Sequence, residues 1–230
     1  MIIGNVQKFS LIDYPGTVCA TLFTQGCTFR CPYCHNPELV EKKLFQKPVP
    51  CKDVIDFLKT RLGKLGGVCI TGGEPTVHGD GLIRFVEEIG KLGFRVKLDT
   101  NGSRPTVLKS LLQRNLLDYI AMDVKAPLSD YPRIVGAPVD PALIEESINL
   151  IMKSGLDYEF RTTVVKSLLS PSDLEKMGKR IEGARRYVLQ KFRPQKTLNS
   201  SYMRETSYND DEFAAIVTRL KRLVPSVSLR

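Results

Sequence analysis

Three cysteines, Cys27, Cys31 and Cys34, lie close together with the spacing C-x3-C-x2-C. Thiolates at this spacing can bind three corners of a cubane iron–sulfur cluster, which leaves the fourth iron without a protein ligand. A cluster used only for electron transfer normally takes four cysteines. The missing fourth ligand therefore predicts a [4Fe-4S] cluster whose open iron takes part in chemistry.

A structural zinc ion is the alternative for the same cysteines. Such sites are closed tetrahedra with four ligands, and His35 adjoins Cys34 too closely to share a metal with it. Cys19, Cys51 or His78 would have to supply the fourth ligand. We favour the cluster, and for His35 we leave open a structural role or a contact to cluster or cofactor.

The segments that must position these cysteines alternate in type along the chain. Short apolar or β-branched runs, bounded by Gly, Pro or Asp, are followed by longer runs of helical period. The predicted strands span Val18–Thr24, Val68–Thr71, Arg95–Asp99, Tyr119–Asp123, Tyr158–Val165 and Tyr187–Lys191. The predicted helices begin near Lys52, Gly81, Pro105, Pro141, Pro171 and Asp210.

Six successive strand–helix units predict an α/β fold with a parallel sheet, because parallel strands need crossover connections. A closed eight-unit barrel usually needs about 250 residues, and this chain has 230. We therefore expect a partial (β/α)6 TIM-like barrel, with a flat doubly wound sheet as the alternative. One domain should span 1–230, with an N-terminal extension over 1–16 and a polar loop and last helix over 193–230.

Both architectures gather active groups at the carboxyl ends of the strands. Polar or glycine-rich groups recur at those ends, and each is weak evidence when taken singly. They follow the cysteine triplet in the order Gly72, Gly73 and Glu74, then Asp99, Thr100 and Asn101, then Asp123 and Lys125, then Arg161, then Gln190. Their recurrence at the same end of successive strands predicts one shared cavity.

The predicted chemistry of this cavity is coherent. An open iron needs a chelating ligand, and an amino-acid moiety supplies an amine and a carboxylate. Glu74 could accept the amine, and the two glycines before it would let backbone and ligand approach closely. The carboxylate could be met by Lys125, by Arg161, or by a cation held by Asp99 and Asp123.

Bulk composition limits the class of protein. Hydrophobic content of 42% with 26% charged residues is ordinary for a globular domain, and no apolar stretch approaches the ~20 residues that span a bilayer. The chain opens without a secretory signal pattern, so we predict a cytoplasmic protein with no membrane partner. The net charge of +9 favours acidic protein partners. The absence of an aromatic-interleaved basic motif disfavours nucleic acid.

With these residues in place, the chain resembles the radical S-adenosylmethionine (SAM) superfamily. The cysteine motif with Tyr33 before its last cysteine is that superfamily's signature, and Gly72–Glu74 resembles its methionine-binding turn. Asp99–Gly102 and Met122–Lys125 are similar to segments of the activases of glycyl radical enzymes. The opening Phe9–Gly16 is similar to that of anaerobic ribonucleoside-triphosphate reductase activating proteins.

The resemblance implies that SAM chelates the open iron of a cluster held by the three cysteines. One electron from a flavodoxin- or ferredoxin-like donor would cleave SAM to methionine and a 5′-deoxyadenosyl radical, which takes a hydrogen atom from a glycine of a partner enzyme. It implies that Tyr33 contacts the adenine, and that a monovalent cation, where present, uses Asp99 and Asp123 with the backbone of Thr100 and Met122. A radical SAM enzyme acting on a small molecule or an RNA base is the alternative.

Overall fold

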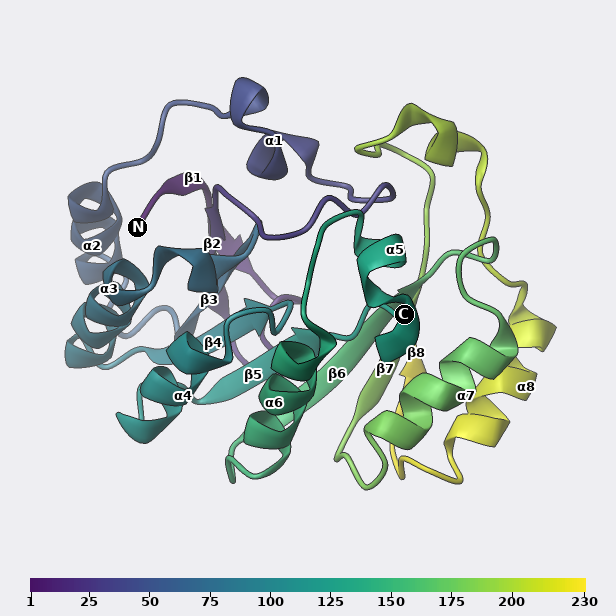
Figure 1. Ribbon diagram of the computed structural model, residues 1–230. Coiled ribbons are helices and arrows are strands. Elements are labelled where there is room, and N and C mark those ends of the chain that lie inside the picture. The colour runs from purple at the N-terminus through teal and green to yellow at the C-terminus, as the bar shows by residue number, and fades with distance from the viewer.

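The computed structural model, which describes residues 1–230, is built on one eight-stranded sheet whose strands follow one another in sequence order (Figure 1). The first two strands pair antiparallel, and every later pair is parallel. The first and last strands are not paired with each other, so the barrel is open. The strands are β1 (Ile3–Ser10), β2 (Cys19–Thr24), β3 (Gly67–Gly72), β4 (Arg95–Thr100), β5 (Tyr119–Asp123), β6 (Asp157–Val164), β7 (Tyr187–Lys191) and β8 (Val227–Leu229).

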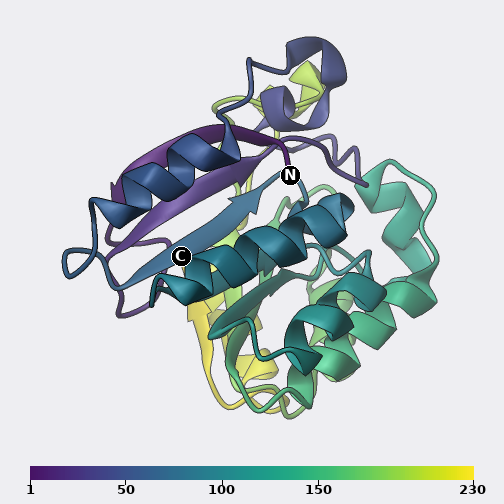
Figure 2. The same ribbon diagram turned by 90° about the vertical axis from the view of Figure 1, so that its left-hand side faces the viewer.

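A long helix connects each parallel pair, and these helices lie on the outer face of the curved sheet (Figures 1 and 2). A doubly wound sheet would reverse its strand order and carry helices on both faces, so the partial barrel is the observed architecture. The long helices are α2 (Cys51–Lys59), α3 (Asp80–Lys91), α4 (Pro105–Gln113), α6 (Pro141–Met152), α7 (Pro171–Arg180) and α8 (Asp210–Leu220). The short ones are α1 (Pro37–Val40), η1 (Lys42–Leu44), η2 (Pro75–His78), η3 (Leu128–Asp130), α5 (Tyr131–Val135) and η4 (Ser200–Arg204).

The six predicted strands and six predicted helix starts are confirmed to within one residue. The helix starts were readable because capping residues mark them: α7 and α8 begin with capping boxes at Ser170 and Asn209. Two strands were not predicted. The structure places β1 within the expected extension 1–16, paired along the edge of β2, and β8 has only three residues.

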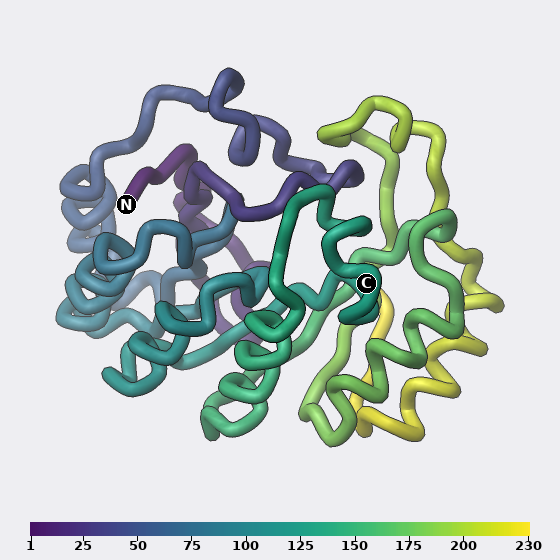
Figure 3. The backbone as a smooth tube through the Cα atoms, viewed as in Figure 1, coloured from purple at the N-terminus to yellow at the C-terminus, as the bar shows by residue number.

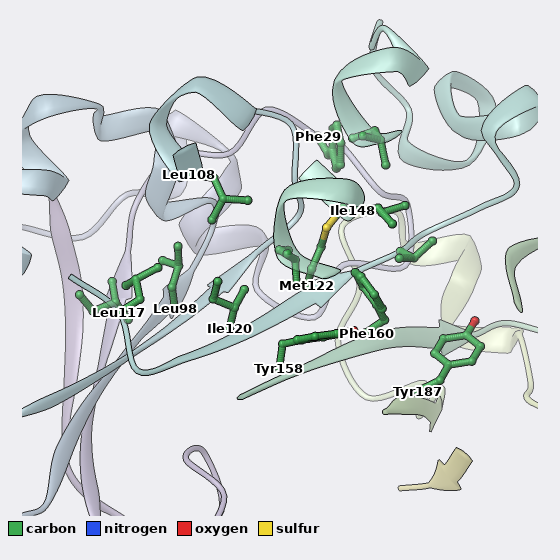
Figure 4. Packing of buried hydrophobic residues seen from close by; sticks show 14 of the residues in the cluster. Phe29, Leu98, Leu108, Leu117, Ile120, Met122, Ile148, Tyr158, Phe160 and Tyr187 are labelled. Carbon is green, nitrogen blue, oxygen red and sulfur yellow. The ribbon is translucent and has the colours of Figure 1, made fainter. Parts of the chain in front are cut away.

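The main hydrophobic core lies between the sheet and its helices. Figure 4 shows Leu98, Ile120 and Phe160 from three neighbouring strands packed towards Leu108 of α4 and Ile148 of α6, all essentially inaccessible to solvent. Such close packing fixes the helices against the outer face. The helices therefore leave the inner face of the sheet uncovered.

The inner face is closed near the amino ends of the strands by a second, smaller core cluster. Its members are Tyr14, Cys19, Cys69, Tyr119 and Ala121. Both cysteines lie in apolar strand runs, which predicts core residues, and both are fully buried. At the opposite, carboxyl end, the long connections 25–50 and 193–209 rise above the rim of the barrel (Figure 3). No helix combines the length and the apolar character needed to cross a bilayer.

Candidate functional site

A pocket of about 200 Å³ lies at the carboxyl ends of the strands, on the inner face of the barrel. The structure brings most of the predicted site residues together there. The pocket is lined by Cys27, Cys31, Tyr33, Cys34, Gly72, Gly73, Glu74, Asp99, Thr100, Asn101, Asp123 and Lys125, and also by His35. Arg161 and Gln190 do not line it. Arg161 contacts the two aspartates, and Gln190 accepts a 3.5 Å hydrogen bond from Thr163 at the pocket wall.

The loop over residues 25–36, which carries the three cysteines and which we name the cysteine loop, rests on the segment that follows β5. The amide of Arg30 donates to the carbonyl of Val135 at 2.8 Å, and the rings of Phe29 and Tyr131 pack edge to face at 6.1 Å. Gly136 has a φ of +61°, and a Cβ at this position would lie 2.6 Å from the Arg30 carbonyl oxygen. A side chain at Gly136 would therefore push the cysteine loop away from its support.

The loop 193–209 holds the cysteine loop from the other side. The amide of Leu198 donates to the carbonyl of Cys34 at 3.0 Å, and the amide of Asn199 donates to that of Pro32 at 2.9 Å. Two backbone hydrogen bonds to the motif itself make this loop part of the site wall.

His35 joins the same two loops through its side chain. Its ring stacks on Phe192 with centroids 5.3 Å apart and planes 10° from parallel, and Nε2 lies 2.8 Å from the carbonyl oxygen of Arg193. These contacts give His35 a structural role at the exposed rim of the pocket.

The glycine turn after β3 packs tightly on the start of the cysteine loop. Gly72 has a φ of +117°, and a Cβ there would lie 2.3 Å from the amide nitrogen of Thr24. A Cβ on Gly73 would lie 2.1 Å from the carbonyl oxygen of Gly26, to which the amide of Glu74 donates at 2.7 Å. The close approach that requires a glycine is to the end of β2 at Gly72 and to the cysteine loop at Gly73. Both glycines also line the pocket, and their contact with a ligand stays a prediction.

Glu74 ties the ends of β3 and β4 together. Its carboxylate is fully buried, and Oε1 accepts from Thr76 N at 3.1 Å, Thr76 Oγ1 at 2.5 Å and Thr100 Oγ1 at 2.7 Å. Oε2 accepts only from the amide of Asn101, at 2.6 Å. Burial raises the pKa of Glu74, and these hydrogen bonds act against that rise. Oε2 keeps a free lone pair for one further donor.

Five alternating charges, which we name the ion row, lie at the pocket and beneath it: Lys97, Asp99, Arg161, Asp123 and Lys125. Lys97 and Arg161 each contact one oxygen of Asp99, the latter from Nη1 at 3.1 Å. Arg161 Nε and Lys125 Nζ each contact one oxygen of Asp123, at 2.9 and 3.0 Å. Burial alone would raise the pKa of Asp123, but Arg161 and Lys125 outweigh burial and lower it to about 2.

The cysteine geometry does not fit a single metal ion. No three His, Cys, Asp or Glu side chains converge closely enough to share one metal ion, whereas in a cubane each thiolate binds a different iron. The fourth zinc ligands that we considered, Cys19, Cys51 and His78, do not line the pocket. Burial raises the pKa of Cys27 to about 12 and that of Cys31 to about 11, so each thiol must release a proton when it binds iron.

Sequence reasoning missed Lys97, the most deeply buried charge of the ion row. Its side chain is 2% exposed, and Nζ lies 3.7 Å from Cys69 Sγ in addition to its contact with Asp99. The signal was present, because alternation along β4 puts Lys97 on the same face as Asp99. Charged residues inside a barrel strand are rare enough to mark a site.

Comparison with known proteins decides the family. The family model described as the radical SAM superfamily matches residues 21–180. The chain belongs to the radical SAM superfamily. Membership implies a [4Fe-4S] cluster and SAM as cofactors, and the pocket described above carries the three cysteines of the signature.

The relatives of this radical SAM chain include activating enzymes. It is 30% identical over its full length to a protein of Methanocaldococcus jannaschii provisionally named a glycyl-radical enzyme activating enzyme, and covers 95% of that relative. It is 27% identical over 85% of its length to the pyruvate formate-lyase-activating enzyme of Clostridium pasteurianum, of which it covers 82%. The chain is thus a radical SAM oxidoreductase of the glycyl-radical enzyme activating group at family level.

A solved structure confirms the fold of this radical SAM enzyme. SuiB of Streptococcus suis, in a crystal structure bound to S-adenosylmethionine, superposes with a TM-score of 0.67 over 90% of this chain and 48% of SuiB, at 14% sequence identity. At that identity the likeness concerns the fold alone.

Proposed function

We propose that this enzyme generates a glycyl radical in a partner protein, and that the partner is an anaerobic ribonucleotide reductase. The observation that carries the proposal is the pocket itself, in which the three motif thiols share one wall with groups suited to an amine and a carboxylate. With cluster and SAM bound, one electron would split SAM into methionine and a 5′-deoxyadenosyl radical, which takes a hydrogen atom from glycine to give 5′-deoxyadenosine.

The residues of the chain have distinct tasks in this proposal. Cys27, Cys31 and Cys34 would each bind one iron, because all three line the pocket. The methionine amine would donate to Oε2 of Glu74, which has only the Asn101 amide as a donor. No acid or base among the side chains is needed, because the cofactors supply the chemistry and the protein orients them.

The ion row supports carboxylate binding. It contains three cations and two carboxylates, so it carries one net positive charge within a buried region. One methionine carboxylate would neutralise it. Lys125 lines the pocket and is the cation of the row best placed to meet that carboxylate directly.

Tyr33 is proposed to contact the adenine. It lines the pocket and is 4% exposed, and its hydroxyl has no hydrogen-bond partner. A buried unpaired hydroxyl costs roughly 1–3 kcal/mol. A polar atom of a bound ligand would remove that cost, while the ring offers a flat apolar surface to the base.

The choice of partner rests on the opening segment and on the relatives. The segment 9–16 resembles activating proteins of anaerobic ribonucleotide reductases, and the relatives reported above are named a glycyl-radical enzyme activating enzyme and a pyruvate formate-lyase-activating enzyme. Phe9, Leu11 and Ile12 of this segment are exposed apolar side chains at the amino end of the barrel, opposite the pocket, where they offer a protein a surface outside the site. We further propose a flavodoxin- or ferredoxin-like protein as the electron donor, favoured by the net charge of +9.

Anaerobic reconstitution tests the proposal. The protein is loaded with iron and sulfide, reduced, and given SAM; methionine and 5′-deoxyadenosine are expected in equal amounts. Addition of a candidate anaerobic ribonucleotide reductase should then produce a glycyl radical signal in electron paramagnetic resonance. A fully loaded protein that never cleaves SAM would refute the proposal. Cleavage coupled only to a small molecule or an RNA base would favour the alternative substrates.

A further inference from the structure

The ion row leaves little room for the monovalent cation that the resemblance suggested. All four oxygens of Asp99 and Asp123 already contact a protein cation, one to each oxygen. A metal ion would have to displace one of these contacts. The residues present therefore do not fit a free cation bound between the two aspartates.

The charge count points the same way. Lys97, Arg161 and Lys125 exceed the two carboxylates by one positive charge. A bound methionine carboxylate would bring the sum to zero. A metal cation in addition would leave an uncompensated positive charge in a buried region, which is costly.

Lys97 is the cation of the row that lies deepest and pairs with a single carboxylate, Asp99. Its ammonium is buried beneath the pocket, beside Cys69 Sγ and 5.9 Å from the ring centroid of Tyr119, and its one carboxylate partner is Asp99. Two cationic members of the row, Lys97 and Arg161, do not line the pocket, so they act on a ligand only through the aspartates. Burying a lysine ammonium with a single carboxylate partner costs considerable desolvation free energy.

We propose that Lys97 is the built-in cation of the SAM site: its ammonium neutralises Asp99 where a monovalent metal ion would otherwise do so, and the enzyme binds and cleaves SAM without any such ion. The inference rests on the proposed function. Lys97 acts through Asp99, and is therefore a positioning residue.

The test compares ions on the reconstituted enzyme. SAM affinity and cleavage are measured in buffers whose only small cation is tetramethylammonium, with and without added potassium or sodium, using a deazaflavin photoreductant in place of sodium dithionite. The wild-type enzyme should respond to potassium or sodium by less than about twofold, a change worth well under the 1.4 kcal/mol of a tenfold effect. A wild-type enzyme that is active only with potassium or sodium would overturn the inference.

The decisive variant is Lys97→Met, which keeps the length of the stem and removes the charge. In tetramethylammonium its SAM dissociation constant should rise about tenfold or more, the scale of one lost charge-assisted contact. Potassium or sodium should restore it, because the metal ion can then take the vacated place beside Asp99. Lys97→Arg should stay independent of the ion, and Lys97→Met combined with Asp99→Asn should show no rescue.

Lys166→Met is the matched control. Lys166 forms an exposed pair with Glu212 and is not a member of the ion row, so its loss should leave the ion response at the wild-type level. A Lys97→Met enzyme that binds SAM as the wild type does in every buffer would contradict the role of Lys97.

A second measurement needs neither cluster nor SAM. The melting temperature of the metal-free protein should rise with potassium in Lys97→Met and not in the wild type, because an ion that binds only the folded state stabilises it. If no variant cleaves SAM, the proposed function fails, while the melting comparison still decides the role of Lys97. If the wild type cleaves SAM but its melting temperature and activity both follow potassium, the inference alone fails.

Discussion

The two ends of the barrel's inner face hold the same kinds of residue and differ in how those residues are satisfied. The carboxyl end has three cysteines on a pocket wall and an ion row whose cations are at most 16% exposed. The amino end has Cys19 and Cys69 in a closed apolar cluster. Its buried carboxylate, Glu159, is held by Tyr119 and by Arg230, whose side chain is 46% exposed.

The difference shows what marks a site in this fold. At the amino end, both oxygens of Glu159 accept hydrogen bonds, and the Arg230 side chain that pairs with it reaches solvent. At the carboxyl end, the ion row holds one net positive charge, Glu74 Oε2 has only one donor, and the Tyr33 hydroxyl has no partner. Unsatisfied groups facing a cavity, rather than residue type, distinguish a binding site from a polar core.

Cysteine replacement should give the largest contrast between the two ends. Cys31→Ala removes one of three proposed iron ligands, so cluster content and SAM cleavage should both fall to background. Cys69→Ala removes a buried thiol at the amino end and should cost roughly 1 kcal/mol of stability at an unchanged cluster content. Iron and sulfide analysis after reconstitution checks both variants.

The outcome is informative in either direction. A Cys31→Ala protein that keeps a full cluster and cleaves SAM would refute the ligand assignment. A Cys69→Ala protein that folds and fails to load its cluster would show that the two ends are not independent.

Replacing the buried carboxylate at each end, Glu74 or Glu159, should give the second-largest difference between the two ends. In Glu74→Gln, the four donors to this side chain would meet an amide that has a single acceptor atom. We therefore expect a loss of about 3 kcal/mol of stability and of most SAM affinity. Glu159→Gln should lose less stability, because its partner Arg230 is half-exposed and the remaining amide oxygen can still accept a hydrogen bond. Its SAM affinity should be unchanged.

Chemical denaturation and equilibrium SAM binding separate the two variants. Equal losses of SAM affinity in both would mean that Glu74 acts only through general stability. Glu74→Asp offers a check, since it keeps the charge but shortens the reach to the Thr100 hydroxyl and the Asn101 amide.

The sequence was sufficient for the architecture and for most of the pocket, for one physical reason. Strand period, helix caps and the glycine turn are local signals, and the parallel topology then carries every strand end to one rim. The edge strand β1 was missed because only antiparallel pairing with β2 defines it. Lys97 and Asp99 lie two residues apart on β4, so strand alternation alone places them on one face. The contacts of Arg161 with Asp99 and Asp123 join β6 to β4 and β5, so they depend on the sheet register, which local patterns do not encode.

Lowering the pH should reduce the unfolding free energy through protonation of Asp123 at the carboxyl end. Its folded pKa of about 2 lies below the ordinary value of 3.8, so its ionised form stabilises the fold. The contribution, on the order of 2 kcal/mol, is fully present above about pH 4 and is lost as the pH falls through about 2. The unfolding free energy of the metal-free protein, followed across this range, should fall more steeply in the wild type than in Asp123→Asn. Identical slopes would remove the ion row from the acid response.

The smallest effect is expected at the rim, with His35→Ala. Loss of its stacking on Phe192 and its contact with the Arg193 carbonyl should cost about 1 kcal/mol and loosen the hold of the loop 193–209. Cluster bleaching in air should then quicken severalfold at an undiminished initial rate of anaerobic SAM cleavage. Lys196→Ala, which removes only an exposed pair with Glu38, should bleach as the wild type does. A His35→Ala enzyme with a full cluster but little SAM cleavage would instead place His35 in contact with the cofactors, and the rim would belong to the reacting part of the carboxyl end rather than to its cover.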